Sequence, residues 1–239
     1  MIPAVRDIWV YLAASPLLWL TATLLAYLGA HWLFRRLGEN PLLNPVALAV
    51  LALLAVLAAT GTDYPTYFDG AQFIHFLPGP ATVALAVPLY THFGTVRRAV
   101  LPMVAALLAG SITAVVSAVG IAWLLGASGE TVASLAPKSV TTPIAMGITE
   151  QIGGLPSLTA VLVILTGIIG AVAVTPLFDL LGLKDWRARG FAAGVAAHGI
   201  GTARAFQVNE LAGTFSGIAM GLNGLATALL VPLLLALLG

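Results

Sequence analysis

Long, mostly apolar segments recur along this chain, and they constrain its fold more than any other feature. An α-helix needs about 20 such residues to cross the roughly 30 Å hydrocarbon layer of a bilayer. A transmembrane β-barrel would alternate apolar and polar residues, but residues 48–59 and 161–174 are apolar on every side. Because only helices and closed barrels satisfy the backbone in lipid, we predict an all-α polytopic membrane protein.

Composition excludes several other classes of protein. Only 8% of the 239 residues are charged, whereas soluble domains average about 25%. The net charge is +1 and no run of Lys and Arg exceeds two residues, which argues against nucleic-acid binding. The absence of cysteine removes disulfides, thiolate catalysis and zinc–cysteine or iron–sulfur sites.

Six segments are predicted to cross the bilayer fully. They are residues 8–34, 42–60, 81–93, 99–125, 158–181 and 215–238. Three apolar pieces between them are too short or too interrupted to cross, at residues 64–77, 139–152 and 191–211. We therefore expect about six transmembrane helices and two re-entrant or broken helical elements.

The basic loops predict the orientation of the spans. Seven of the ten basic residues lie in three loops, at Arg35 and Arg36, at Arg97 and Arg98, and at Lys184, Arg187 and Arg189. Such loops face the cytoplasm, so an even number of crossings separates the second from the third. Residues 139–152 should then dip in from the outer side, and residues 191–211 from the cytoplasmic side.

The two dipping segments also match each other at an offset of 60 residues. The identities are Thr142 with Thr202, Ala145 with Ala205, Glu150 with Glu210, and Gly153 with Gly213. Related segments that enter from opposite faces are typical of inverted-repeat transporters, whose broken helices meet near the midplane. If both segments instead cross completely, the chain has eight spans and the Lys184 loop lies outside, against the charge rule.

The first candidate site is the run from Pro137 to Pro143, in which two prolines bracket three hydroxyls and one cation. Proline ends helices, so this run should be partly unwound, which membrane depth tolerates only around a buried or wet cavity. Free N–H groups at the start of a half-helix would then bind an anion. The predicted substrate contacts are Lys138, Ser139, Thr141, Thr142 and Pro143. The alternative is an outer loop whose hydroxyls cap a short helix.

The second candidate site is the run from Ala197 to Arg204. Here we predict substrate contacts from His198, Gly199, Gly201, Thr202 and Arg204. Arginine inside a membrane needs a counter-charge or a substrate, and its fork suits a carboxylate. In an empty site Glu210 could pair with it; alternatively, Arg204 lies in a cytoplasmic loop. His198 could carry a coupled proton or could be a structural imidazole bonded to a carbonyl.

Three further features are polar or broken within apolar surroundings. Asn223, inside the last span, either faces the cavity or bonds between helices. Asp179 is predicted to form an interfacial ion pair with Lys184, and residues 77–82 form a hinge, a third lining element of the cavity or a simple turn. Hydrolase, zinc-protease, Walker and dinucleotide-binding motifs are absent, so we predict no enzyme, no catalytic residues and no metal.

Several long motifs resemble the LrgB/CidB family. The resemblance covers the chain from about Tyr67 to the C-terminus, with Pro78 and Gly147 as departures. The runs that carry it are Gly79–Ala86, Lys138–Ala145, Gln151–Gly154, His198–Ala205 and Gly221–Gly224.

The resemblance implies two functions. The family was described as antiholin-like regulators of murein hydrolase activity and cell lysis, encoded beside a smaller LrgA/CidA membrane partner. It also resembles plastid glycolate/glycerate translocators, and bacterial pairs are associated with pyruvate uptake. A small monocarboxylate of the glycolate, glycerate, lactate or pyruvate type is therefore the expected substrate.

Our leading hypothesis is a secondary transporter in the cytoplasmic membrane of the cell, with a holin- or antiholin-like regulator as the alternative. A single membrane domain is expected, with scaffold spans at 1–77 and a transport core at 78–239 that contains related segments near 139–182 and 190–238. No cofactor is expected; H⁺ or Na⁺ coupling would use His198, Glu150 or Glu210. The expected partners are a small LrgA/CidA-type protein and the lipid bilayer. The small-residue face at 105–118 would serve a homodimer or internal packing.

Overall fold

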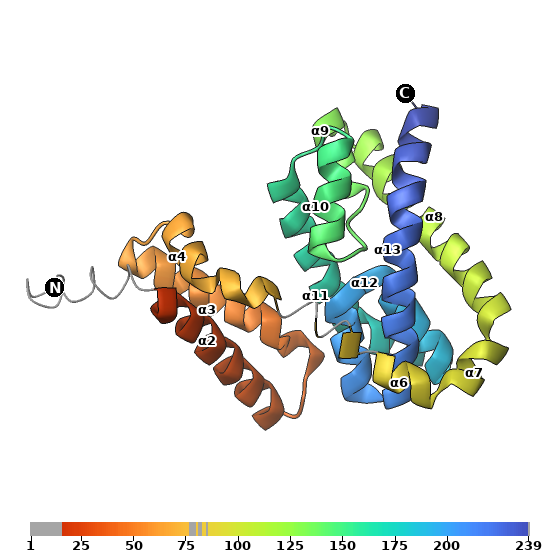
Figure 1. The fold of residues 1–239 in the computed structure, drawn as a ribbon, viewed down its shortest axis with the longest axis horizontal. Helices are drawn as coiled ribbons and strands as arrows, with labels where there is room; N and C mark the ends of the chain where they lie inside the picture. Colours follow the sequence, from red (N-terminus) through yellow and green to blue (C-terminus); the bar gives the residue numbers. More distant parts are fainter. Residues whose placement is uncertain (1–15, 77–79, 81–82, 85, 239) are drawn as a thin grey trace, which may run out of the picture. The chain divides into compact units, whose positions relative to one another are not determined.

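The computed structural model describes residues 16–76, 80, 83–84 and 86–238, and these form helices joined by short links (Figure 1). The chain divides into two compact units, Met1–Ala84 and Leu85–Gly239. The first unit contains α2 (Pro16–Arg36), η1 (Pro41–Leu43), α3 (Pro45–Thr60), α4 (Tyr64–Ala71) and η2 (Gln72–Phe76). The second contains α6 (Ala86–Thr91), α7 (Phe93–Arg98), α8 (Val100–Leu124), α9 (Gly129–Leu135), α10 (Thr142–Gln151), α11 (Pro156–Leu180), α12 (Trp186–Val208) and α13 (Glu210–Leu238).

The first unit is a small helical cluster with a well-defined start and end to α3. The Asn44 side chain accepts hydrogen bonds from two N–H groups of the first turn, and Gly61 ends the helix with φ +66°. Trp19 of α2 is buried and packs edge-on against Tyr67 of α4, with ring centroids 5.7 Å apart. Aromatic packing therefore holds α4 against α2.

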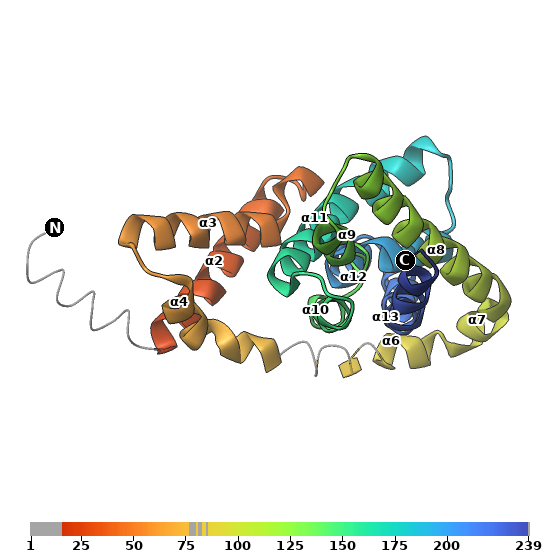
Figure 2. The ribbon, with the colours of Figure 1, turned by 90° about the horizontal axis from the view of Figure 1, so that it is seen from above.

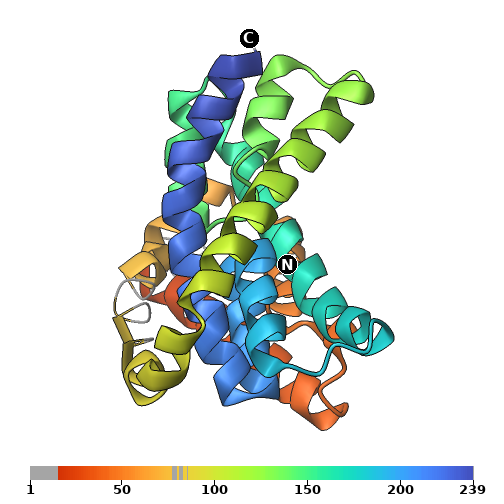
Figure 3. The same cartoon turned by 90° about the vertical axis from the view of Figure 1, so that its right-hand side faces the viewer.

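Three long helices form the frame of the second unit. α8, α11 and α13 are each at least 25 residues long and mostly apolar. The C-terminal end of α13 lies near the end of α8 that leads into α9, while α12 lies at the opposite end (Figure 3). α8 and α13 therefore run in one direction, and α11, which lies between them in the sequence, runs in the other.

A first hairpin, residues 129–151, joins α8 to α11 and consists of α9, a link at 136–141 and α10. Ser134 fastens it to α11: its hydroxyl accepts a hydrogen bond from the Leu155 N–H at 2.8 Å, and its carbonyl accepts one from Thr159 at 2.9 Å. Thr149 on α10 lies 2.8 Å from the same Thr159 hydroxyl. Both limbs of the hairpin are thus tied to the start of α11, and α10 lies beside α13 (Figure 2).

A second hairpin joins α11 to α13 at the other end of the unit. The helical geometry of α12 is broken at Ala197 and His198, so the element consists of limbs at 186–196 and 199–208. A Cβ on Gly201 would lie 2.9 Å from the Ala193 carbonyl oxygen, although eight residues of continuous helix would place these positions about 12 Å apart. The second limb therefore folds back along the first.

The structure confirms the all-helical class but not the predicted count of six spans. Four of the described helices are long and apolar enough to cross a membrane, within α2, α8, α11 and α13. α3 has 16 residues, and within the described part of 81–93, α6 ends at Thr91. Residues 8–15, the Pro78 departure, the predicted boundary at 77/78 and most of the run 77–82 lie outside the described residues.

Candidate functional site

The link of the first hairpin places a cation at the point where the chain reverses. Pro137 cannot donate a backbone hydrogen bond and follows the end of α9, and Pro143 lies in the first turn of α10. Between them, the half-buried Lys138 donates from Nζ to the Ser139 hydroxyl at 3.3 Å. No carboxylate pairs with Lys138 among the described residues. This ammonium group therefore lacks a counter-charge.

The start of α10 adds donors beside this cation. Thr141 occupies the N-cap position in an extended conformation, but its side chain makes no capping hydrogen bond. Thr141 and Thr142 are partly exposed, whereas Ser139 is buried. The positive end of the α10 dipole therefore lies beside Lys138, an arrangement that favours an anion.

The break in the second hairpin is held by hydrogen bonds and close packing. His198 has φ +41°, a strained value for a residue with a Cβ. Its Nε2 lies 2.9 Å from the Val163 carbonyl on α11, and its own carbonyl accepts a hydrogen bond from Thr202 at 2.8 Å. Gly167 makes room for the ring, because a Cβ there would lie 2.7 Å from it. His198 thus matches the structural alternative, an imidazole bonded to a carbonyl.

Asn223 joins the two breaks. Its side-chain amide donates to the Val195 carbonyl of the second hairpin at 2.9 Å and to the Ser139 carbonyl of the first at 3.3 Å. Its oxygen accepts from Ser111 on α8 at 2.6 Å. The residue is 1% exposed, so it bonds between elements and does not face a cavity. We call the place where the two links meet around Asn223 the junction.

The junction collects some of the predicted site residues and leaves others out. Lys138 lies in the link of the first hairpin and His198 at the break of the second, the two places that Asn223 joins. Gly201 and Thr202 are buried in the second limb, where Thr202 also lies 2.9 Å from the Ser216 hydroxyl. Gly199 and Pro143 lie at the starts of their limbs, and Pro143 is exposed.

Arg204 lies away from the junction. Only Ala197 and His198 depart from helical geometry, so the second limb carries Arg204 back toward the loop end, where it lines a small pocket with Arg189. The sequence had suggested Glu210 as the partner of Arg204, but the Arg204 guanidinium instead donates to Gln207 at 3.4 Å. Its Nε is buried without a partner among the described residues.

The predicted coupling carboxylates are also distant from the junction. Glu150 is exposed near the end of α10, and Glu210 is exposed at the start of α13, with its carboxylate 4.0 Å from His92. The interfacial pair predicted for Asp179 exists, but its partner is Arg189, at 2.6 Å, and not Lys184. Arg189 also donates from Nε to the Leu183 carbonyl.

Ser111 and Ser216 were missed from the sequence. Both are fully buried hydroxyls within long apolar helices, and each bonds a residue of the junction. Polar residues inside a span were the available signal. No cluster of three His, Asp or Glu side chains that could hold a metal occurs in the described part of the chain.

Comparison with known proteins agrees with the motifs. A family model described as LrgB-like matches residues 23–237. The chain belongs to the LrgB family. The family resemblance found in the sequence is thereby confirmed. Together with the four long apolar helices, this membership identifies a membrane protein.

Relatives of this LrgB-family chain come from several bacteria. The protein YwbG of Bacillus subtilis is 35% identical over 90% of this chain and 95% of its own length. A holin-like protein CidB of Staphylococcus epidermidis is 31% identical over 83% of this chain and 87% of its own length, and a Haemophilus influenzae protein is 34% identical over 81% and 84%. No solved structure matches.

Proposed function

We propose that this LrgB-family protein is a multi-pass secondary transporter that carries small monocarboxylates across the cytoplasmic membrane. One observation supports the proposal most: the half-buried Lys138, with no acidic partner in the described structure, lies where two broken helices meet. A cation at membrane depth is costly unless an anion neutralises it. The helix start at Thr142 adds backbone donors for a carboxylate.

The arrangement of the two hairpins also favours transport. They approach the junction from opposite ends of the α8–α11–α13 frame, as in transporters built from inverted repeats. Movement of the first hairpin against the rest of the unit would open the junction alternately to each side. The inverted repeat, the coupling ion and a small LrgA/CidA-type partner belong to this proposal.

A second candidate function is a holin-like regulator of murein hydrolase activity and cell lysis. Relatives at 29–31% identity carry the name holin-like protein CidB, and this similarity favours the second function more directly than it favours transport. A pore for lysis, however, would need no uncompensated cation beside two helix breaks. The two functions differ in the selectivity of what crosses the bilayer.

Uptake into liposomes that contain the purified protein tests the proposal. Saturable entry of radiolabelled glycolate, lactate or pyruvate is expected, with at least about tenfold slower entry for Lys138→Gln, because a charge-assisted hydrogen bond contributes about 1.5–3 kcal/mol. Lys184→Gln, which removes an exposed loop cation, should retain uptake.

The same liposomes distinguish the rival function. A transporter should retain entrapped calcein, whereas a lysis pore should release it. If no acid enters, with or without the small partner and a pH gradient, transport is wrong and the holin-like function replaces it.

A further inference from the structure

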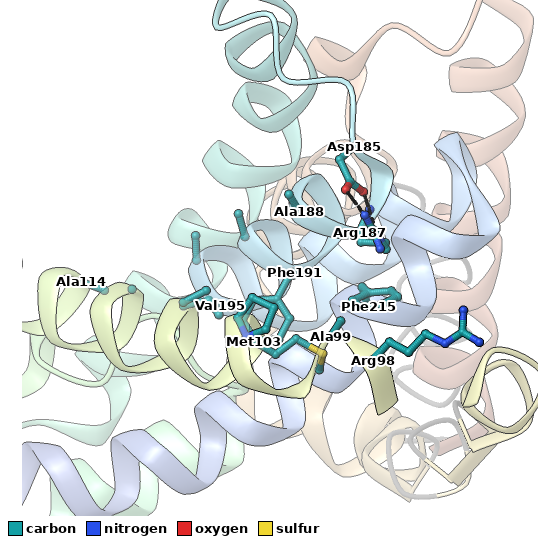
Figure 4. A pocket seen from close by; sticks show the side chains of 15 residues that line it. Arg98, Ala99, Met103, Ala114, Asp185, Arg187, Ala188, Phe191, Val195 and Phe215 are labelled. Atoms are coloured by element: carbon teal, nitrogen blue, oxygen red, sulfur yellow. Dashed lines mark hydrogen bonds and ion pairs between the residues drawn. The ribbon is translucent and has the colours of Figure 1, made fainter. Parts of the chain in front are cut away.

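A long groove runs between α8 and the first limb of α12 (Figure 4). Its volume is about 540 Å³. Small residues at intervals of four form much of its wall, because residues at this spacing share one face of a helix. They are Ala106, Gly110 and Ala114 on α8 and Ala188, Ala192 and Ala196 on α12. We call this surface the α8–α12 groove.

Charged groups lie at only one end of the groove. Arg98, Asp185 and Arg187 lie there, and Ala114 lies at the far end (Figure 4). Arg187 donates to Asp185 at 2.6 Å, and this hydrogen bond holds the pKa of the Asp185 carboxyl below its ordinary value. The pair is therefore neutral overall at pH 7. Arg98 is exposed and makes no ion pair among the described side chains, so it is the uncompensated charge of the groove.

The groove has the length of a lipid chain. Arg98 ends α7, directly before α8, and the 14 residue steps from Val100 at the start of α8 to Ala114 correspond to about 21 Å. One leaflet contributes about 15 Å of a roughly 30 Å hydrocarbon core. A groove that starts at Arg98, directly before α8, would therefore begin at the membrane interface and extend past the tails of one leaflet.

We propose that the α8–α12 groove binds an anionic phospholipid, with its phosphate on the Arg98 guanidinium and one acyl chain along the Ala/Gly wall. Guanidinium groups bind phosphate oxygens through paired hydrogen bonds. The wall beyond the charged end offers an apolar surface that suits a hydrocarbon chain.

Other occupants fit the groove less well. A transmembrane helix 10–12 Å across and about 21 Å long fills roughly 2,000 Å³, several times the volume of the groove. A small carboxylate would leave most of the apolar wall against water. Neither combines a single charged end with a long apolar body.

Titration of the purified, delipidated full-length protein with lipid tests the proposal, with thermal unfolding in detergent as the readout. Phosphatidylglycerol should stabilise the protein at about fivefold lower concentration than phosphatidylcholine, since one basic residue contributes about that factor toward anionic lipid. The preference should disappear in Arg98→Gln and persist in Arg97→Gln, whose exposed side chain does not line the groove.

A second pair of variants tests the acyl chain. Ala106→Phe fills the groove and should abolish stabilisation by either lipid, while Ala105→Phe, at an exposed position outside the groove, should not. Equal losses in Arg97→Gln and Arg98→Gln would overturn the proposal in favour of a diffuse basic surface. Stabilisation by inorganic phosphate that survives in Ala106→Phe would also overturn it, as would a change of oligomeric state or of partner binding in Ala106→Phe with lipid binding intact. Arg98→Gln alters an exposed side chain, so the test holds even if Ala106→Phe does not fold.

Discussion

Both hairpins of the second unit reverse the direction of the chain, but the reversals differ in length and in bonding. In the first, a six-residue link that contains Pro137 and is followed by Pro143 makes the reversal, and Lys138, Thr141 and Thr142 are left partly exposed. In the second, Ala197 and His198 alone make it, and the polar groups there bond within the protein. The first link thus keeps unused charge and donors, while at the second break His198 and Thr202 are buried and bonded within the protein.

This difference suggests a division of roles. Glycines let the second hairpin approach α13 so closely that a Cβ on Gly190 or Gly194 would clash with a backbone carbonyl. Around Gly147 on the first hairpin there is open space. We infer that the second hairpin is scaffold and that the first supplies the groups that bind the anion.

The largest expected effect contrasts glycines of the two hairpins. Gly194→Ala should destabilise the protein by about 3 kcal/mol, because the added Cβ meets the Ser216 carbonyl and lies 2.8 Å from the Ala219 Cβ. Gly147→Ala should be neutral or stabilising, since alanine favours helix. Unfolding in sodium dodecyl sulfate measures both; equal effects would refute the difference in packing.

Loss of the α13 residue that hydrogen-bonds to both hairpins should have the next largest effect. Asn223→Ala removes the donors to Val195 and Ser139 and leaves buried carbonyls unpaired, at a cost of about 2 kcal/mol. Asn209→Ala removes only a hydrogen bond to the Ala212 N–H and should cost about 1 kcal/mol. The same unfolding assay measures both variants. If Asn223→Ala loses less stability than Asn209→Ala, the two breaks do not depend on the Asn223 hydrogen bonds.

Hydroxyl groups of the two hairpins should differ by a smaller amount. Thr202→Val deprives the His198 carbonyl and the Ser216 hydroxyl of a partner and should cost about 1 kcal/mol. Thr141→Val should leave stability unchanged, since its side chain makes no capping bond. Thermal unfolding of the pair checks this, and a destabilised Thr141→Val would contradict the account of the first link.

The smallest effect is expected at the start of the second hairpin. Asp185→Asn should cost about 0.5 kcal/mol or less, because the ion pair with Arg187 is exposed and asparagine can still cap the helix. The pKa of Asp185 is lowered in the folded protein, so its contribution is present above the ordinary carboxyl pKa and is lost as the pH falls through the lowered value. Melting at pH 7 and pH 3 measures it; a loss as large as that of Asn223→Ala would contradict this ranking.

Much of the second unit could be predicted from its apolar runs and prolines. The long spans at 99–125 and 158–181 correspond to α8 and α11, and the two breaks fall within or beside the predicted runs. α9 was missed because its seven residues give too short a pattern, and its polar start suggests a loop. The hairpin limb that precedes Lys138 was therefore not expected.

The site was less predictable because side-chain direction depends on where each helix restarts. A broken helix was expected within 191–211, but helical geometry resumes at Gly199, which moves Arg204 to the loop end beside Arg189. The sequence left open whether Asn223 faces a cavity or bonds between helices. The side chain is buried, and its amide bonds to three elements that are 28 to 112 residues away in sequence. The assignment of substrate contacts stays a prediction.

Equilibrium binding of radiolabelled glycolate or pyruvate to the purified protein tests the division of roles most directly. Wild type and Thr202→Val should bind with similar affinity, while Lys138→Gln should bind at least about tenfold more weakly and keep the wild-type melting temperature. Binding that survives in Lys138→Gln but is lost in a still-folded Thr202→Val would contradict the account, because the second hairpin would then supply the ligand.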